Sequence, residues 1–222
     1  MLARHILKPG TGSPIVFLHG FLGTSADWAA VVQHLPAPCI AFDLPGHGAS
    51  PFTLQWEQTL TREEPFHLVG YSLGGRLALR YAQTHSVLSL TLISAHLGLP
   101  SDSERQARAT EERLWLNKLG TLPIDEFVRQ WYDQPLFKTL SKDVCKMRTQ
   151  NQNQVQLAHA LQAFALSKQP CYPLPSNSKL ICGEHDTTYR NHYAKYPHTV
   201  IPDAGHAVHL ENPEELHRHL VP

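Results

Sequence analysis

The sequence carries no excess of charge of either sign. Its 222 residues include 19 lysines and arginines against 19 aspartates and glutamates. A chain without a basic or acidic surplus creates no overall field that favours nucleic acid or an anionic membrane. No apolar run approaches the roughly 20 residues of a membrane-spanning helix, and no charged-then-apolar leader precedes Pro14. We therefore expect no nucleic-acid partner and no membrane partner.

Cysteine is also scarce. Cys39, Cys145, Cys171 and Cys182 lack the close spacing of a metal site, so the sequence predicts no thiol-bound metal. Cys39 and Cys182 fall in predicted strands, which fits buried reduced thiols better than a disulfide framework. This cysteine usage favours a cytoplasmic protein.

Apolar residues make up 42% of the chain, enough for one sizeable core. Short apolar strands alternate with helix-like stretches before residue 95 and again after residue 170. This alternation predicts an α/β fold with a mostly parallel central sheet and helices on both faces. The expected strands are residues 2–8 (at an edge), 14–18, 38–42, 66–69, 87–93, 180–183 and 199–202, and the expected helices are residues 26–35, 52–61, 75–83 and 214–220.

The middle of the chain has a different pattern. Residues 96–170 contain no convincing strand, and their polar helical stretches are residues 102–119, 124–132, 142–150 and 154–167. We predict a core formed by residues 1–95 and 171–222, with residues 96–170 inserted as a helical cap over the site.

Residues 70–75 read Gly-Tyr-Ser-Leu-Gly-Gly between a predicted strand and a predicted helix. A serine with glycine neighbours in that setting is typical of a nucleophile elbow, in which a strained turn holds the serine Oγ above the sheet edge. Ser72 is therefore the candidate catalytic serine. The elbow also directs the Leu73 N–H toward the substrate, as one donor of an oxyanion hole. The Phe21 N–H, just after the predicted strand 14–18, should be the second donor.

Partners for this serine follow two late strands. Asp186 comes just after residues 180–183, and His206 comes just after residues 199–202. The order Ser72, Asp186, His206 is that of the α/β-hydrolase catalytic triad. The chain has 15 histidines, but His206 follows Gly205 on a loop above the sheet, which suits a general base. Asp43 remains an alternative acid, although it precedes the serine.

Nearly the whole chain resembles the MenH family of α/β-hydrolases. The shared motifs are residues 17–21 (Phe-Leu-His-Gly-Phe), 43–48 (Asp-Leu-Pro-Gly-His-Gly), 70–76, Glu104-Arg105 with Arg108 and Trp115, 131–137 and Cys182-Gly183-Glu184 with Asp186. The most specific features are Arg76 directly after the elbow glycines, the Trp-Tyr-x-Gln-Pro motif that begins at Trp131, and Arg148 followed by Asn151. The resemblance implies that Tyr71, Arg76, Arg108, Trp131 and Arg148 bind the substrate.

The resemblance further implies a lyase of menaquinone (vitamin K2) biosynthesis. The implied substrate is 2-succinyl-5-enolpyruvyl-6-hydroxy-3-cyclohexene-1-carboxylate, a small tricarboxylate. In the implied reaction, proton abstraction through the triad eliminates pyruvate and gives 2-succinyl-6-hydroxy-2,4-cyclohexadiene-1-carboxylate. No metal, organic cofactor or acyl-enzyme is needed, and we expect a monomer.

The position of Arg76 also favours an anionic substrate on physical grounds. A cation in the first turn of a helix lies at the positive end of the helix dipole and costs a few tenths to about 1 kcal/mol. A carboxylate bound bidentately would compensate, whereas a neutral ester would not. We expect Arg105, Arg113 and Arg129 to be solvated.

Two alternative functions stay open: a carboxylesterase or carbon–carbon bond hydrolase using the same triad, and a non-catalytic binding module.

Overall fold

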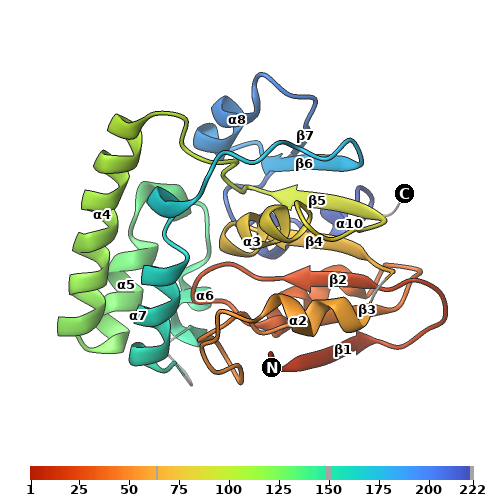
Figure 1. Ribbon diagram of the computed structural model, residues 1–222, viewed down its shortest axis with the longest axis horizontal. Coiled ribbons are helices and arrows are strands. Elements are labelled where there is room, and N and C mark those ends of the chain that lie inside the picture. The colour runs from red at the N-terminus through yellow and green to blue at the C-terminus, as the bar shows by residue number, and fades with distance from the viewer. Residues whose placement is uncertain (64, 149–151, 221–222) are drawn as a thin grey trace.

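The computed structural model describes residues 1–63, 65–148 and 152–220. Within them, one seven-stranded sheet has the order β1-β3-β2-β4-β5-β6-β7 (Figure 1). β1 pairs antiparallel with β3, and every other pairing is parallel. The strands are β1 (Arg4–Lys8), β2 (Ile15–Leu18), β3 (Cys39–Phe42), β4 (His67–Tyr71), β5 (Ser89–Ile93), β6 (Ser178–Gly183) and β7 (Thr199–Ile201). The predicted α/β-hydrolase fold class, including the edge strand near the N-terminus, is confirmed.

Helices cover both faces of the sheet, and others gather at one side of it. In Figure 1, α2 and α3 lie in front of the sheet, and α4 to α7 lie together beyond the ends toward which the parallel strands run. The helices are α1 (Ala29–Val32), α2 (Glu57–Leu60), α3 (Leu73–Tyr81), α4 (Asp102–Thr121), α5 (Ile124–Tyr132), α6 (Lys142–Met147), α7 (Gln154–Ala163), α8 (Thr187–Tyr193), α9 (Val208–Glu211) and α10 (Pro213–His217). Short 3₁₀ helices are η1 (Ser25–Trp28), η2 (Thr61–Glu63), η3 (Pro135–Phe137) and η4 (Leu166–Lys168). Helices α4 to α7 fall within the predicted cap, and the core and cap boundaries stay predictions.

Side chains that alternate along each strand build two cores, one on each face of the sheet. In β2, Val16 and Leu18 join the cluster beneath α3, whereas Ile15 and Phe17 join the cluster beneath α1, α9 and α10. All four are fully buried, so both faces are covered, as in other parallel sheets.

The cysteines of two central strands are also buried. Cys39 in β3 and Cys182 in β6 are free thiols, and burial raises the pKa of each to about 11. None of the helices in the described ranges is long and apolar enough to cross a membrane.

Several predicted helices are shorter than expected, and in one of them a local hydrogen bond explains the late start. Residues 26–35 form only η1 and the single turn α1. Within residues 52–61, Thr53 Oγ1 accepts the N–H of Gln55, and this local turn delays the helix until Glu57. Residues 154–167 are helical only to Ala163, and residues 149–150 of the expected helix 142–150 lie outside the described residues. Helices α8 and α9 were not predicted, since neither short sequence shows a clear apolar stripe.

The start of α3 passes very close to β2. A Cβ added at Gly74 would overlap the backbone carbonyl oxygens of Leu18 and His19, which cannot move without disturbing the strand end. The first turn of α3 can therefore lie against this strand only because residue 74 has no side chain.

We predict that Gly74→Ala lowers the free energy of unfolding by at least about 2 kcal/mol, because the added methyl overpacks the backbone of β2. Chemical denaturation measures the change. Gly120→Ala is the matched control: it lies in α4 with no heavy atom within 4 Å of the added Cβ, so the same substitution should stabilise by about 0.5 to 1 kcal/mol. A Gly74→Ala protein as stable as the parent would contradict this packing.

Candidate active site

Ser72 has a strained backbone at the junction of β4 and α3. Its φ of 50° and ψ of −111° are unusual for a residue other than glycine. Its N–H donates to the carbonyl of Ile93 in the neighbouring strand at 2.9 Å, which ties the turn to the sheet. This is the geometry expected of a nucleophile elbow.

His206 lies between Ser72 and Asp186. Its Nδ1 is 2.9 Å from Asp186 Oδ2, and its Nε2 is 3.3 Å from Ser72 Oγ. His206 is 1% exposed and Asp186 3% exposed, so water competes little for their contact. The other Asp186 oxygen accepts the N–H of Tyr189 at 3.1 Å and caps α8. The structure therefore brings the three residues of the predicted triad together in the predicted order of contacts.

The alternative acid, Asp43, is hydrogen-bonded elsewhere. Its carboxylate accepts the backbone N–H groups of Ser25 and Ala49 at 2.8 and 2.9 Å. Burial opposes its charge, but these N–H donors hold the pKa of Asp43 below its ordinary value. Asp43 therefore orders the turn that precedes Ser50, and Asp186 is the carboxylate paired with His206.

The two residues predicted to supply the oxyanion donors, Phe21 and Leu73, line the same cavity as Ser72. Leu73 is the first residue of α3, and N–H groups in the first turn of a helix have no partner within the helix. Phe21 lies in a turn closed by a 3.0 Å hydrogen bond from the Gly23 N–H to the Gly20 carbonyl. One N–H group is thus at the start of α3 and the other in the turn after β2. Their role as oxyanion-hole donors stays a prediction.

A cavity of about 620 Å³ opens above Ser72. Its walls come from both the sheet side and the cap helices. They include Phe21, Ser72, Leu73, Arg76, His96, Arg108, Glu112, Trp115, Lys118, Trp131, Gln134, Phe137, Phe164, Tyr189 and His206. Such a volume suits a small-molecule ligand.

Arg76 is one of the cationic side chains that line this cavity, and its hydrogen-bond acceptors are neutral. Its guanidinium donates to the Phe164 carbonyl at 2.7 Å and to Gln169 Oε1 at 3.2 Å. Among the described carboxylates, none lies within ion-pair distance of it. Burial lowers the pKa of Arg76 to about 10, so the guanidinium stays charged near neutral pH. An anion in the cavity would therefore find an uncompensated positive charge.

Arg108 is already partly neutralised. It contacts Glu111 at 3.4 Å and Glu112 at 3.1 Å, both on its own helix. Glu112 is buried and also accepts the Leu166 N–H at 2.6 Å, which links α4 to η4. Glu112 thus holds the Arg108 guanidinium in place at the cavity wall.

Arg148 and Tyr71 lie outside this cavity, in a smaller one of about 30 Å³ on the other side of Ser72. Arg148 is buried and forms a 2.6 Å ion pair with Asp27. Burial opposes its charge, but interactions with Tyr132 and Asp27 raise the pKa of Arg148 above its ordinary value. Tyr71 is buried, with its ring 5.2 Å from that of His206. Trp131 lines both cavities, and Asn151 lies outside the described residues.

Several residues of the large cavity were not predicted to bind the substrate, although Trp115 belongs to the motifs shared with the MenH family. On α4, Trp115 and Lys118 share the cavity face with Arg108, and the Lys118 ammonium lies 4.5 Å from the centre of a Trp115 ring. Their spacing of seven and three residues would place them on one face of a helix, a signal available in the sequence. His96 and Tyr189 also line the cavity, but nothing in their local sequence distinguishes them from surface residues.

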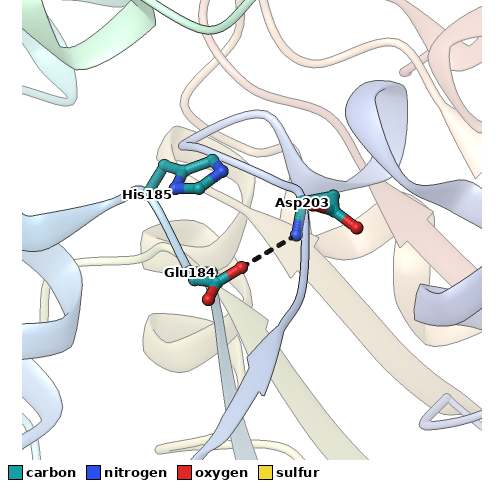
Figure 2. A group of neighbouring side chains, drawn as sticks. All are labelled: Glu184, His185 and Asp203. Carbon is teal, nitrogen blue, oxygen red and sulfur yellow. Dashed lines mark hydrogen bonds between the residues drawn. The ribbon is translucent and has the colours of Figure 1, made fainter.

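Glu184, His185 and Asp203 form an exposed group beside the triad loops (Figure 2). Their ligand atoms lie within 4.8 Å of one another. Glu184 Oε2 accepts the Asp203 N–H at 3.2 Å, so one potential metal-binding oxygen is used to join the loops after β6 and β7. Exposed groups of this kind are common without an ion.

Comparisons with known proteins agree with this geometry. The family model described as the alpha/beta hydrolase family matches residues 15–219. The 2-succinyl-6-hydroxy-2,4-cyclohexadiene-1-carboxylate synthase of Serratia proteamaculans is 30% identical over 96% of this chain and 94% of its own. The synthase of the same name from an Enterobacter species is 34% identical over 93% and 91%.

Solved structures share the fold. The structure of MenH from S. aureus superposes with a TM-score of 0.87 at 23% identity, covering 98% of this chain and 95% of that one. A malate-bound thermophilic esterase from Thermogutta terrifontis gives a TM-score of 0.70 at 20% identity, covering 98% and 90%. The chain is therefore an enzyme on the α/β-hydrolase scaffold and belongs to the MenH family.

Proposed function

We propose that this enzyme eliminates pyruvate from 2-succinyl-5-enolpyruvyl-6-hydroxy-3-cyclohexene-1-carboxylate to give 2-succinyl-6-hydroxy-2,4-cyclohexadiene-1-carboxylate. The observation that carries the proposal is the placement of Arg76, a charged guanidinium without a carboxylate partner, in the same cavity as Ser72 and His206. The names of the Serratia and Enterobacter relatives support this choice among the reactions that a serine triad can perform.

In the proposed reaction, His206 accepts the Ser72 hydroxyl proton, and Asp186 holds the imidazole in the required orientation. The serine oxygen then takes the proton from the ring carbon next to the succinyl carbonyl. Electrons shift through the ring double bond, the bond from the ring to the enolpyruvyl oxygen breaks, and the enolate of pyruvate leaves. The enolate takes up the proton held by His206 and becomes pyruvate, which returns the imidazole to its neutral form. The serine is a base here, so no acyl-enzyme forms and no cofactor is required.

Negative charge develops on the succinyl carbonyl oxygen during proton removal. We assign its stabilisation to the N–H groups of Phe21 and Leu73, whose residues border Ser72 in the cavity. One such donor is worth about 3 kcal/mol in comparable sites.

The substrate's carboxylates would bind to the cavity's cations. Arg76 and Arg108 line the large cavity and are the proposed direct ligands. The small cavity beside Arg148 has room for about one water. A carboxylate can therefore reach Arg148 and Tyr71 only if the wall formed by Phe21 and Trp131 moves.

The decisive experiment is to measure pyruvate release from the enolpyruvyl substrate by the purified protein. We predict that Ser72→Ala lowers the rate by about 10⁴- to 10⁶-fold, since the base is lost, while the circular dichroism spectrum stays unchanged. A rate of pyruvate release within tenfold of the parent would show that Ser72 is not the base. Ester hydrolysis without pyruvate release by the parent would favour the carboxylesterase alternative.

We predict that Asp186→Asn and His206→Ala are each severely impaired and that the double variant is little worse than the slower single variant. Residues that act as one proton-relay unit give strongly non-additive losses. A double-mutant cycle on kcat/KM measures the coupling. Independent, multiplicative losses would mean that one residue does not belong to the relay.

We predict that Arg76→Ala lowers kcat/KM for the anionic substrate by about 100-fold, because a desolvated carboxylate loses a charged partner. Arg108→Ala and Arg148→Ala should give losses in the same direction. Arg113→Ala is the matched control, since Arg113 is exposed and donates to Thr110 outside the cavity. Equal losses on a small neutral ester would show instead that Arg76 supports the fold.

A further inference from the structure

The backbone on both sides of His206 is held by one carboxylate. The Gly205 N–H donates to Glu211 Oε2 at 2.8 Å, and the Ala207 N–H donates to Glu211 Oε1 at 3.0 Å. The two oxygens of one side chain therefore hold the two N–H groups that flank the candidate base.

Local structure explains how Glu211 reaches this position. It is the last residue of α9, and its own N–H donates to the Ala207 carbonyl at 3.0 Å, which folds the turn back on the His206 loop. Gly205 leaves room for the carboxylate, since an added Cβ there would lie 3.1 and 3.3 Å from the two Glu211 oxygens and would overlap Thr139 Oγ1.

The reach of His206 depends on this backbone. Its Nε2 is 3.3 Å from Ser72 Oγ, already near the upper limit for a hydrogen bond. The ring is packed among Tyr71, Phe137 and Tyr189, with centroids 5.2, 5.5 and 5.1 Å away. A shift of a few tenths of an ångström in the loop would therefore break the contact with the serine while the ring stays packed.

We propose that Glu211 is a positioning residue for His206. Its carboxylate fixes the backbone at residues 205 and 207, so that one imidazole nitrogen meets Asp186 and the other reaches Ser72. The inference rests on His206 as the base of the proposed function, but not on which substrate the enzyme uses.

Glu184, in the loop after β6, provides a matched comparison because it contacts the same His206 loop. Its carboxylate also accepts an N–H of the His206 loop, that of Asp203 at 3.2 Å (Figure 2). Glu184 is exposed, however, it makes one such contact, and the N–H that it accepts lies three residues before the histidine rather than next to it. If these glutamates only stiffen the loop in general, replacing either one should lower activity. If Glu211 positions His206, only its replacement should do so.

The test uses Glu211→Gln, Glu211→Ala and Glu184→Gln in the full chain. A fluorophosphonate probe reports the contact between His206 and Ser72 without the natural substrate: Ser72 Oγ bonds to phosphorus, fluoride leaves, and the serine proton passes to His206. We expect the labelling rate and kcat for pyruvate release to fall at least tenfold in Glu211→Gln, with KM within twofold of the parent. Glu211→Ala should be slower still, since the glutamine carbonyl can still accept one N–H.

Glu184→Gln should stay within twofold of the parent in every measurement. The proton NMR signal of the His206 Nδ1–H should shift or broaden in Glu211→Gln, even if its thermal midpoint is unchanged. Parental labelling and kcat in Glu211→Gln, or the same loss in Glu184→Gln, would overturn the proposal. If His206→Ala also labels at the parental rate, the base assignment of the proposed function fails as well; if His206→Ala abolishes labelling, only the role of Glu211 fails.

Discussion

The close approach of α3 to β2 is the constraint on which the site depends. Because Gly74 has no side chain, the first turn of the helix lies directly on the strand end, and the chain must turn sharply at Ser72 to enter it. The strained backbone of Ser72, the position of its side chain at the cavity and the adjacent Leu73 N–H all follow from that turn. The neighbouring loops then need only bring one imidazole and one carboxylate to a position that the elbow has already fixed.

Those loops are held by polar contacts of the backbone rather than by apolar packing alone. The Glu184 N–H donates to the Ile201 carbonyl at 2.8 Å, and the His185 N–H donates to the Ala204 carbonyl at 2.8 Å. The ends of β6 and β7 are thus joined just before Asp186 and just before His206. These contacts fix the positions of Asp186 and His206, so the proposed triad would need no rearrangement for each turnover.

The sequence was sufficient to predict the sheet, the sharp turn at Ser72 and the side chains that meet there, because each depends on local patterns: apolar strands, small residues around Ser72, and polar residues directly after strands. It could not predict α8 and α9, since their ends are set by contacts such as the Asp186 cap. Nor could the sequence show that Arg148 and Arg76 have different partners. Arg148 forms an ion pair with Asp27 behind Phe21, whereas Arg76 donates hydrogen bonds to neutral acceptors in the cavity.

The hydrogen bonds of Arg76 join parts of the chain that are far apart in sequence. Its guanidinium donates to residues 164 and 169, at the C-terminal end of the helical insertion, while its own helix belongs to the elbow. An anion that took these N–H groups would displace a carbonyl and an amide oxygen, so anion binding and the anchoring of residues 164–169 would use the same donors. If the proposed substrate binds in this way, its binding and the anchoring of residues 164–169 would be thermodynamically linked: tighter anchoring would lower the apparent affinity for the anion by the same factor by which the anion weakens the anchoring.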